Sequence, residues 1–269
     1  MPLAAARLGG DRRAAEVGLA LAEFQWSEPT EKTDFVVAGH NTLDGARGYF
    51  ADGYSGQTRL WIDDRYMIGL LQTEAYRLSG DRKFIDRAAR EMSLYIERLQ
   101  LPDGLFHHAP GAPFVWGRGA GWMASAMALV LSCMEPGDQY RDEILAGYRR
   151  MAARLLKCQR DDGLWGQLVD DPQSWPETSC SAMFAYAIAE GVTHGWLEGP
   201  EWRDCVERAW DALCERMDPL GNISDVCVGT EWKNDRSHYL SRPRAVGDPH
   251  GQAPMLWLAG AIDRMRTRR

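Results

Sequence analysis

The sequence lacks the patterns that mark several common classes of protein. No run of about 18 apolar residues is present, so we expect no membrane-spanning helix. There is no glycine-rich phosphate loop, no G-x-S-x-G motif, and no zinc-ligand spacing. The six cysteines form no C-x-x-C pair, and we expect them to be reduced and mostly buried. These absences argue against nucleotide, serine-hydrolase and metal-dependent chemistry, and we expect no cofactor and no metal.

Positive charge is also scarce. The chain has 31 lysines and arginines against 38 aspartates and glutamates, a net charge of -7. Neither a phosphate backbone nor an acidic lipid surface attracts such a protein, which argues against nucleic-acid and membrane partners. An anionic small substrate would need locally placed arginines. The N-terminus lacks the apolar segment of a signal peptide, so we expect a cytoplasmic protein.

Apolar and aromatic residues are abundant. Of the 269 residues, 45% are hydrophobic, and no linker divides the chain, so we expect one domain over residues 1–269. Several of the 11 tryptophans stand beside charged residues outside the expected helices. An indole in such a place can stack on a sugar and donate a hydrogen bond.

Helical periodicity dominates the chain, and two kinds of helix alternate. Helices that are apolar on nearly all sides must be buried on all sides, and we expect these over 66–75, 121–134, 182–189 and 254–262. Helices with a single apolar stripe would form an outer wall, and we expect these over 82–99, 139–158 and 200–217. A further helix over 12–26 would bury Val17, Leu21 and Phe24, whereas residues 25–59 indicate a loop with short extended pieces.

The turns between these helices repeat. Asp103-Gly104-Leu105-Phe106 and Asp162-Gly163-Leu164-Trp165 begin 59 residues apart, and a related turn follows near Gly221. A fixed period of this size is typical of stacked supersecondary units. We therefore predict an all-α fold in which helical hairpins lie side by side, as in an α/α toroid.

A polar and aromatic segment precedes each helix that we expect to be buried. The four segments are RLWIDDRYM from Arg59, FVWGRGAGW from Phe114, SWPETS from Ser174 and GDPHGQAP from Gly247. In a ring of hairpins the buried helices run in one direction, so the four segments would collect at one mouth. The helix N-termini there would favour an anion. We interpret this mouth as a binding site.

Asp63 and Asp64 are the only carboxylate pair at such a helix start. Either residue could simply cap the helix. Because neighbouring side chains on a helix diverge by about 100°, one could cap it while the other faces a cavity. Burial against Trp61 would raise the pKa of a carboxyl group and suit it to acid catalysis.

Other candidates carry similar alternatives. His107, His108 and His250 could bind a ligand or be structural histidines. Arg118 lies between glycines and tryptophans, which suits carboxylate recognition, but an internal salt bridge is the alternative. The segment 233–244 could cover an anionic sugar or be a solvated loop.

Several longer motifs occur in a definite order: WIDDRYM, DGLFHHAP followed by WGRGAGW, DGLWGQLVDDPQSWPETSC, DVCVGT and DPHGQAP. Over about residues 10–262 the chain thereby resembles the unsaturated glucuronyl and rhamnogalacturonyl hydrolases of glycoside hydrolase families 88 and 105. The resemblance implies an (α/α)6 barrel. It also implies an enzyme that removes a 4,5-unsaturated uronic acid from the non-reducing end of oligosaccharides left by polysaccharide lyases. In this chemistry an aspartate protonates C4, water adds at C5, and the resulting hemiketal opens to release the uronate.

The resemblance implies that Asp63 is the general acid and base. It places Trp61 in the wall of the site, and His108, Trp116, Arg118 and Trp122 against the substrate. Together with the pattern of polar segments, it leads us to expect substrate contacts from Trp61, Asp64, His108, Trp116, Arg118, Trp122, Trp175, Lys233, Arg236, Tyr239 and His250.

The chain also departs from these families, whose members usually begin with a further helical hairpin that carries a second aspartate. Asp44 lies only 19 residues before Asp63, too close for the intervening hairpin, so we do not assign Asp44 the role of that second aspartate. We therefore expect an N-terminally shortened toroid, with a homodimer as one way to cover its exposed helices. Two alternatives stay open: an inactive sugar-binding remnant, or another α/α-toroid enzyme, either a glycosidase or an epimerase that uses His108 and His250.

Overall fold

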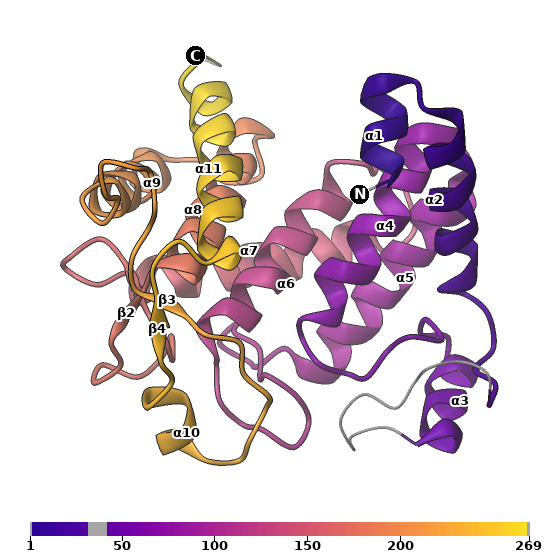
Figure 1. Cartoon of the computed structure of the whole chain (residues 1–269), viewed down its shortest axis with the longest axis horizontal. Coiled ribbons are helices and arrows are strands. Elements are labelled where there is room, and N and C mark those ends of the chain that lie inside the picture. The colour runs from indigo at the N-terminus through magenta and orange to yellow at the C-terminus, as the bar shows by residue number, and fades with distance from the viewer. Residues whose placement is uncertain (1, 32–41, 268–269) are drawn as a thin grey trace. The chain divides into compact units, whose positions relative to one another are not determined.

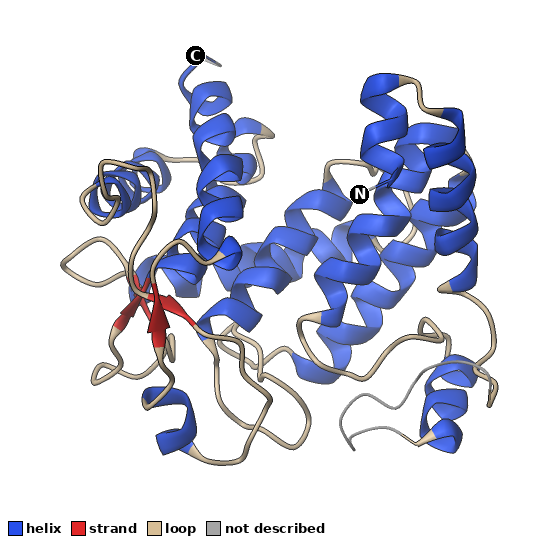
Figure 2. Cartoon of the chain, in the orientation of Figure 1, coloured by secondary structure: helices blue, strands red, loops and turns tan. Residues whose placement is uncertain are grey.

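Helices account for most of the regular structure (Figures 1 and 2). The computed structural model of the chain describes residues 2–31 and 42–267. Its helices are α1 (Pro2–Gly9), α2 (Arg12–Phe24), α3 (Leu43–Asp52), α4 (Asp64–Ser79), α5 (Arg82–Leu99), α6 (Gly117–Leu131), α7 (Arg141–Cys158), α8 (Thr178–Thr193), α9 (Pro200–Cys214), α10 (Arg236–Leu240) and α11 (Pro249–Thr267). Two short antiparallel sheets join β1 (Trp165–Gly166) to β2 (Pro176–Glu177) and β3 (Val226–Cys227) to β4 (Arg244–Ala245). The predicted all-α class is confirmed.

The chain divides into two compact units, which are described separately. The first unit comprises Met1–Arg98 and Leu129–Ile144, and the second comprises Leu99–Ala128 and Leu145–Arg269. The three boundaries fall inside α5, where only Leu99 belongs to the second unit, and inside α6 and α7, which each contribute to both units. The single domain over residues 1–269 stays a prediction.

In the first unit, α1, α2 and α4 pack against one another around Leu3 and Ala22. The predicted buried face of α2 is wrong. Val17, Leu21 and Phe24 remain 45–47% exposed, whereas Gly18 and Ala22 are buried. The reason is α1, which the periodicity did not indicate: its Leu3 side chain lies so close to Gly18 that a methyl group there would overlap it. Small residues therefore form the contact, and the larger side chains face outward.

Helix α3 corrects the prediction of a loop over residues 25–59. The Thr42 hydroxyl accepts the Gly45 N–H at 3.1 Å and caps the start of the helix. Gly53, with φ 99°, ends it in the left-handed conformation. Only Ala46 of this helix is buried, which explains why no apolar period predicted it. Residues 32–41 of the expected loop lie outside the described residues.

In the second unit, the two repeated turns make the same pair of side-chain hydrogen bonds. The Gln100 side-chain amide donates to the carbonyl of Gly104 (3.0 Å) and to a carbonyl of α7 (2.8 Å). The Gln159 amide donates to the carbonyl of Gly163 (2.9 Å) and to a carbonyl of α9 (2.9 Å). Both glycines have positive φ, 101° and 84°. The period of 59 residues thus reflects a repeated helix–turn–helix contact.

The eight helices predicted from periodicity are all present, with shifted ends. Helix α8 is buried along nearly its whole length and packs against both α9 and α11. Helix α11 begins at Pro249, before the predicted start, and contains Pro254. It is not buried on all sides, since Leu256 is 75% exposed. Helices α4, α6, α8 and α11 each begin within one of the four polar segments. None of the helices in residues 2–31 and 42–267 combines the length and apolar character that a membrane span requires.

Candidate functional site

The first group of candidate residues lies in the first unit, on the turn that leads into α4. Leu60 has φ 57°, an uncommon conformation for a residue other than glycine, and its side chain is buried. Such strained positions often occur at functional sites, where the surrounding structure holds them. This strained residue separates Arg59 from Trp61, ahead of the helix.

Asp64 holds this turn together. Its carboxylate, which is almost fully buried, accepts the Arg59 backbone N–H at 2.8 Å and the Arg59 guanidinium at 2.9 and 2.5 Å. Burial raises the pKa of Asp64 to about 6, although Arg59 opposes the rise. Burial lowers the pKa of Arg59, but the charge of Asp64 outweighs this effect and the net direction is upward. Asp64 is thus committed to Arg59 in this structure, whereas substrate binding by Asp64 stays a prediction.

Asp63 occupies a different position on the same turn. It stands at the N-cap of α4, is half-buried, and makes no side-chain capping bond. Trp61 is 8% exposed and lies beneath the Arg59 guanidinium, whose central carbon is 4.3 Å from the ring centroid. The capping alternative therefore does not describe Asp63. Its role as general acid stays a prediction.

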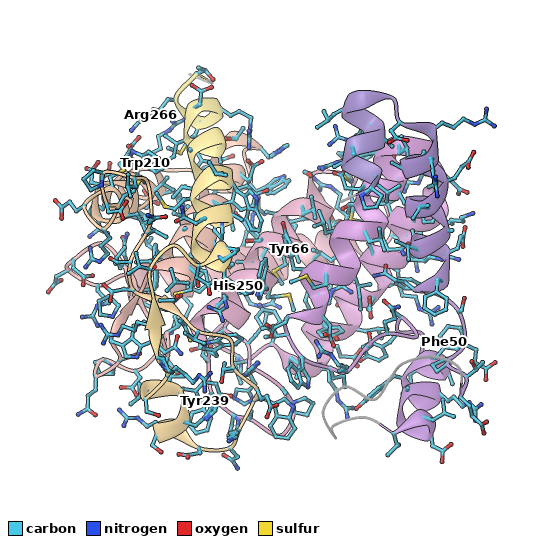
Figure 3. All side chains as sticks on the ribbon, viewed as in Figure 1. Phe50, Tyr66, Trp210, Tyr239, His250 and Arg266 are labelled. Atoms are coloured by element: carbon cyan, nitrogen blue, oxygen red, sulfur yellow. The ribbon has the colours of Figure 1, made fainter. Side chains whose placement is uncertain are left out.

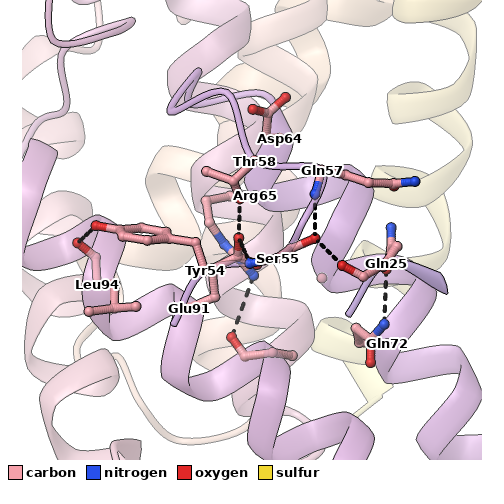
Figure 4. Close-up of polar contacts among 12 residues, drawn as sticks. Gln25, Tyr54, Ser55, Gln57, Thr58, Asp64, Arg65, Gln72, Glu91 and Leu94 are labelled. Atoms are coloured by element: carbon pink, nitrogen blue, oxygen red, sulfur yellow. Dashed lines mark hydrogen bonds and ion pairs between the residues drawn. The ribbon is translucent and has the colours of Figure 1, made fainter. Parts of the chain in front are cut away.

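A buried network supports this turn from below (Figure 4). Glu91 of α5 is fully buried, accepts the Ser55 N–H at 3.1 Å and the Thr58 hydroxyl, and pairs with the fully buried Arg65. The Arg65 guanidinium lies over the Tyr95 ring at 5.4 Å. The buried pair, together with the hydrogen bonds that Glu91 accepts, fixes the neighbouring segment. The segment that leads to Trp61 is thus tied to α5.

Sequence reasoning did not identify this network. Its one signal is the placement of Glu91, a carboxylate, three residues after Ala88 and four before Tyr95, within the apolar stripe of α5. A buried acid on such a stripe requires an internal cation.

The second group lies in the second unit and centres on Tyr239 of α10, labelled in Figure 3. Its hydroxyl accepts the Lys233 backbone N–H at 3.2 Å and lies 2.8 Å from Nδ1 of His108. Because the oxygen accepts the Lys233 N–H, its own proton is available for donation to Nδ1. His108 is fully buried, and its ring lies 4.6 Å from Trp116. Tyr239 therefore ties the predicted covering segment to the turn before α6.

Arg118, the second residue of α6, is 2% exposed. Its guanidinium donates to the carbonyl of Cys227 and lies 4.9 Å from the Trp116 ring centroid. The Cys227 N–H in turn donates to Glu177 at 2.9 Å, and Glu177 caps α8. The internal partner of Arg118 is therefore a carbonyl rather than the acid considered from the sequence. This chain of contacts brings the starts of α6 and α8 together with β3.

The remaining predicted residues of the covering segment differ in environment. Arg236 is exposed and forms an ion pair with Asp171 at 2.6 Å. Trp175 is half-buried and donates from Nε1 to the carbonyl of Leu240 at 3.1 Å. Lys233 is exposed. Contacts of these side chains with a substrate stay predictions.

Trp122 and His250 form part of an aromatic cluster in the second unit. The Trp122 ring lies 6.5 Å from His250 and 6.0 Å from Trp257, which in turn lies 6.0 Å from Tyr186. His250 is exposed, and its Nδ1 is 2.8 Å from Asp248. Burial raises the pKa of Asp248, but the bonds from His250 outweigh this effect and lower it. Sequence reasoning missed Trp257 and Tyr186. The signal for Trp257 is its position seven residues after His250 on one helix, which places both on one face.

A cavity of about 550 Å³ in the second unit is lined largely by charged residues between Arg154 and Pro172 and includes none of the candidates. Within the described ranges, no three His, Cys, Asp or Glu side chains are arranged to hold a metal ion.

Comparison with known proteins identifies the family. The family model described as Glycosyl Hydrolase Family 88 matches residues 27–266. The chain belongs to glycosyl hydrolase family 88. The resemblance stated from the motifs is thereby confirmed, and so is its placement among the glycoside hydrolases.

Relatives of this family 88 chain include two curated enzymes. It is 24% identical over 188 residues to an unsaturated 3S-rhamnoglycuronyl hydrolase of an Alteromonas species, covering 65% of this chain and 46% of that protein. It is 26% identical over 245 residues to an unsaturated rhamnogalacturonyl hydrolase of Bacillus subtilis, covering 88% and 67%. The chain thus spans about half to two thirds of the length of these relatives.

Among solved structures, a candidate member of the GH105 family from Salmonella enterica superposes with a TM-score of 0.82 at 22% identity. That match covers 99% of this family 88 chain and 70% of the other. A match at this identity shows the fold alone, so the chain shares the fold of that structure.

Proposed function

We propose that this chain removes a 4,5-unsaturated uronic acid from the non-reducing end of oligosaccharides, with Asp63 as general acid and base. Family membership and the names of the two curated relatives support the reaction class. The observation that carries the choice of residue is the turn before α4. There Asp63 is half-buried and does not cap the helix, while Asp64 and Arg59 fix the backbone that presents it.

In the proposed reaction, the Asp63 carboxyl group transfers its proton to C4 of the C4=C5 double bond. Positive charge then develops at C5, where the ring oxygen stabilises it. Water adds to C5 and gives a proton to the Asp63 carboxylate, which restores the acid. The hemiketal opens by breaking the bond between C5 and the ring oxygen, so C5 becomes a ketone. The hemiacetal left at C1 then releases the shortened oligosaccharide as an alcohol, and one water is consumed overall.

We propose different roles for the two groups of residues in the second unit. The buried His108, Tyr239 and Arg118 act as positioning residues, because His108 Nδ1 bonds to the Tyr239 hydroxyl and Arg118 donates to the Cys227 carbonyl. The aromatic cluster of Trp122, Trp257 and exposed His250 suits contact with a sugar, because ring faces stack on its C–H surface. Full burial of His108 also argues against its use as one of two facing bases, and hence against an epimerase.

The decisive experiment is turnover of lyase-generated unsaturated oligosaccharides in deuterium oxide. Direct protonation by Asp63 from one face should place one deuterium at C4 of the product as a single diastereomer, measured by NMR early in the reaction. Conventional cleavage at the anomeric carbon would release the unsaturated uronate intact, and its later rearrangement in solution would label C4 without facial preference. A mixture of C4 diastereomers from the first turnovers would therefore contradict the proposal, as would absence of turnover on pectin, glycosaminoglycan and ulvan fragments.

Two finer expectations accompany this proposal. The homodimer stays a prediction, and sedimentation would contradict it by finding a fully active monomer. The cytoplasmic location likewise stays a prediction from the sequence, and fractionation of the producing cell tests it.

A further inference from the structure

A groove of about 410 Å³ in the first unit lies outside the turn before α4. Its volume is within the range of small-ligand sites, about 300–1,000 Å³. The lining residues are Trp26, Lys83, Asp86, Arg87, Arg90, Gln139 and Tyr140. The hollow thus brings two aromatic rings together with cationic and hydrogen-bonding side chains.

Helix α5 forms the floor of this groove. Lys83, Asp86, Arg87 and Arg90 follow one another at positions i, i+3, i+4 and i+7, which share one face of a helix. Lys83 pairs with Glu23 and Asp81, and Arg87 pairs with Glu23, which leaves Arg90 as the cation of this face outside these ion pairs. Arg90 can therefore attract an anion into the groove.

Trp26 forms one wall, directly after α2. Its N–H donates to the carbonyl of Glu23 at 2.9 Å. Glu23 pairs with Lys83 at 2.6 Å and with Arg87 at 2.9 Å, so this wall is tied to the floor. The hydrogen bond from Lys83, with help from Arg87, lowers the pKa of Glu23. Because the indole is half-buried, part of its ring remains accessible.

Tyr140 forms the other wall. It has φ 67°, a conformation that is rare for an aromatic residue and is found where the surroundings impose it. The ion pair between Asp138 and Arg82, at 2.7 Å, ties this loop to the start of α5. The groove is therefore a built hollow whose two walls are each fastened to one helix.

We propose that this groove is a second binding site, which takes an acidic saccharide such as a chain of uronic acid residues. The Trp26 and Tyr140 rings would stack on sugar faces. Arg90, which is exposed and lies against Gly53, would pair with a uronate carboxylate. Asp86 and Gln139 would accept hydrogen bonds from sugar hydroxyls.

A saccharide carboxylate suits the groove better than a nucleotide does. Arg90 can balance the single charge of a carboxylate, whereas a phosphate, which carries up to two negative charges, would leave a charge unbalanced near Asp86. The choice of a uronate ligand rests on the proposed function, whose substrates carry uronates, whereas the groove itself does not depend on that reaction.

The test measures binding of saturated oligogalacturonate by titration calorimetry. This ligand has carboxylates but no double bond, so the proposed reaction cannot consume it. Trp26→Ala and Arg90→Gln should each raise Kd about tenfold, the loss expected for one stacking contact or one charged pair. Two matched controls should leave Kd unchanged: Trp210→Ala, which removes a half-buried indole on α9 (Figure 3), and Arg98→Gln, which removes an exposed arginine from the same helix α5.

Circular dichroism first verifies that the variants are folded. Equal Kd values for the wild type, Trp26→Ala and Arg90→Gln would then overturn this proposal. Binding of adenosine monophosphate without binding of oligogalacturonate would also overturn it. Turnover of an unsaturated substrate, assayed in the same proteins, separates the two proposals. Its absence in every protein would refute the hydrolase function, and the calorimetry would still decide on the groove.

Discussion

The turns that lead into α4 and α6 each contain a tryptophan and an arginine but use their charged residues differently. Both place an arginine over a tryptophan, Arg59 over Trp61 at 4.3 Å and Arg118 over Trp116 at 4.9 Å. Before α4, the arginine is neutralised by Asp64 and a second carboxylate, Asp63, is left outside the capping bonds. At the start of α6, the arginine donates to a backbone carbonyl. A tryptophan beside a charge thus does not decide the role of that charge, since the exposed Arg244 also lies over Trp175, at 4.4 Å. The neighbouring residues decide it.

The largest effect is expected from Asp63→Asn. Loss of the proposed general acid should lower kcat by about 10³-fold, within the range for proton transfer by a positioned side chain. The free energy of unfolding should change by less than about 1 kcal/mol, because asparagine keeps the shape and no capping bond is lost. Steady-state kinetics and urea unfolding measure the two quantities. Asp44→Asn, on the exposed side of α3, is the matched control. Wild-type kcat in Asp63→Asn would assign the turn before α4 a structural role only.

The next largest effect concerns the pH dependence of stability at the turn before α4. With a folded pKa of about 6 and an ordinary value of 3.8, Asp64 keeps its proton in the folded state through a window in which the unfolded chain has released it. Raising the pH through this window therefore destabilises the folded state, by about 3 kcal/mol between pH 3.8 and 6. Urea unfolding of the wild type and Asp64→Asn at pH 4, 5, 6 and 7 measures this. The difference between the two proteins should fall as pH rises, and parallel curves would show that Arg59 cancels the effect of burial.

A smaller effect is expected at the turn before α6. Arg118→Met removes the donor to the Cys227 carbonyl but keeps most of the buried volume. An unsatisfied buried acceptor costs about 1–3 kcal/mol, which thermal and urea unfolding would detect. KM should change by less than about threefold, because the loss of one direct charged contact would cost considerably more. A KM raised a hundredfold at unchanged stability would move Arg118 from a positioning role to direct contact with the substrate.

Some of these differences could be predicted from the sequence, and others could not. Periodicity located the long helices because each has a continuous apolar face, as in α5 and α8. It failed for α1 and α3, whose few buried residues form no period, and it misassigned the face of α2 because Gly18 carries no side chain to mark a contact. Periodicity records where large side chains are buried and cannot record a close approach between backbones.

The candidate site shows a similar division. The polar segments before the helices were found because a tryptophan or charged residue at a helix start is conspicuous. The sequence did not show which of Asp63 and Asp64 has which role, because adjacent carboxylates differ only in the direction that the backbone gives them. That direction depends on the positive φ of Leu60, which a leucine side chain does not predict. Glu91 and Trp257 were missed because each lies inside a helix, where its residue type alone does not reveal its partner.

The smallest effect is expected from Arg236→Gln. Arg236 is exposed and pairs with Asp171 at 2.6 Å, and an exposed ion pair contributes about 0–1 kcal/mol. If the pair only orders the surface near α10, unfolding and KM should both stay close to wild type, and 0.5 M salt should abolish what difference there is. If Arg236 instead leaves Asp171 to contact a uronate, KM should rise in Arg236→Gln and fall in Asp171→Asn, which frees the arginine. Opposite changes in KM from the two partners would therefore place a substrate-binding residue in the second unit, and they would show that a charge with an internal partner can still serve the substrate.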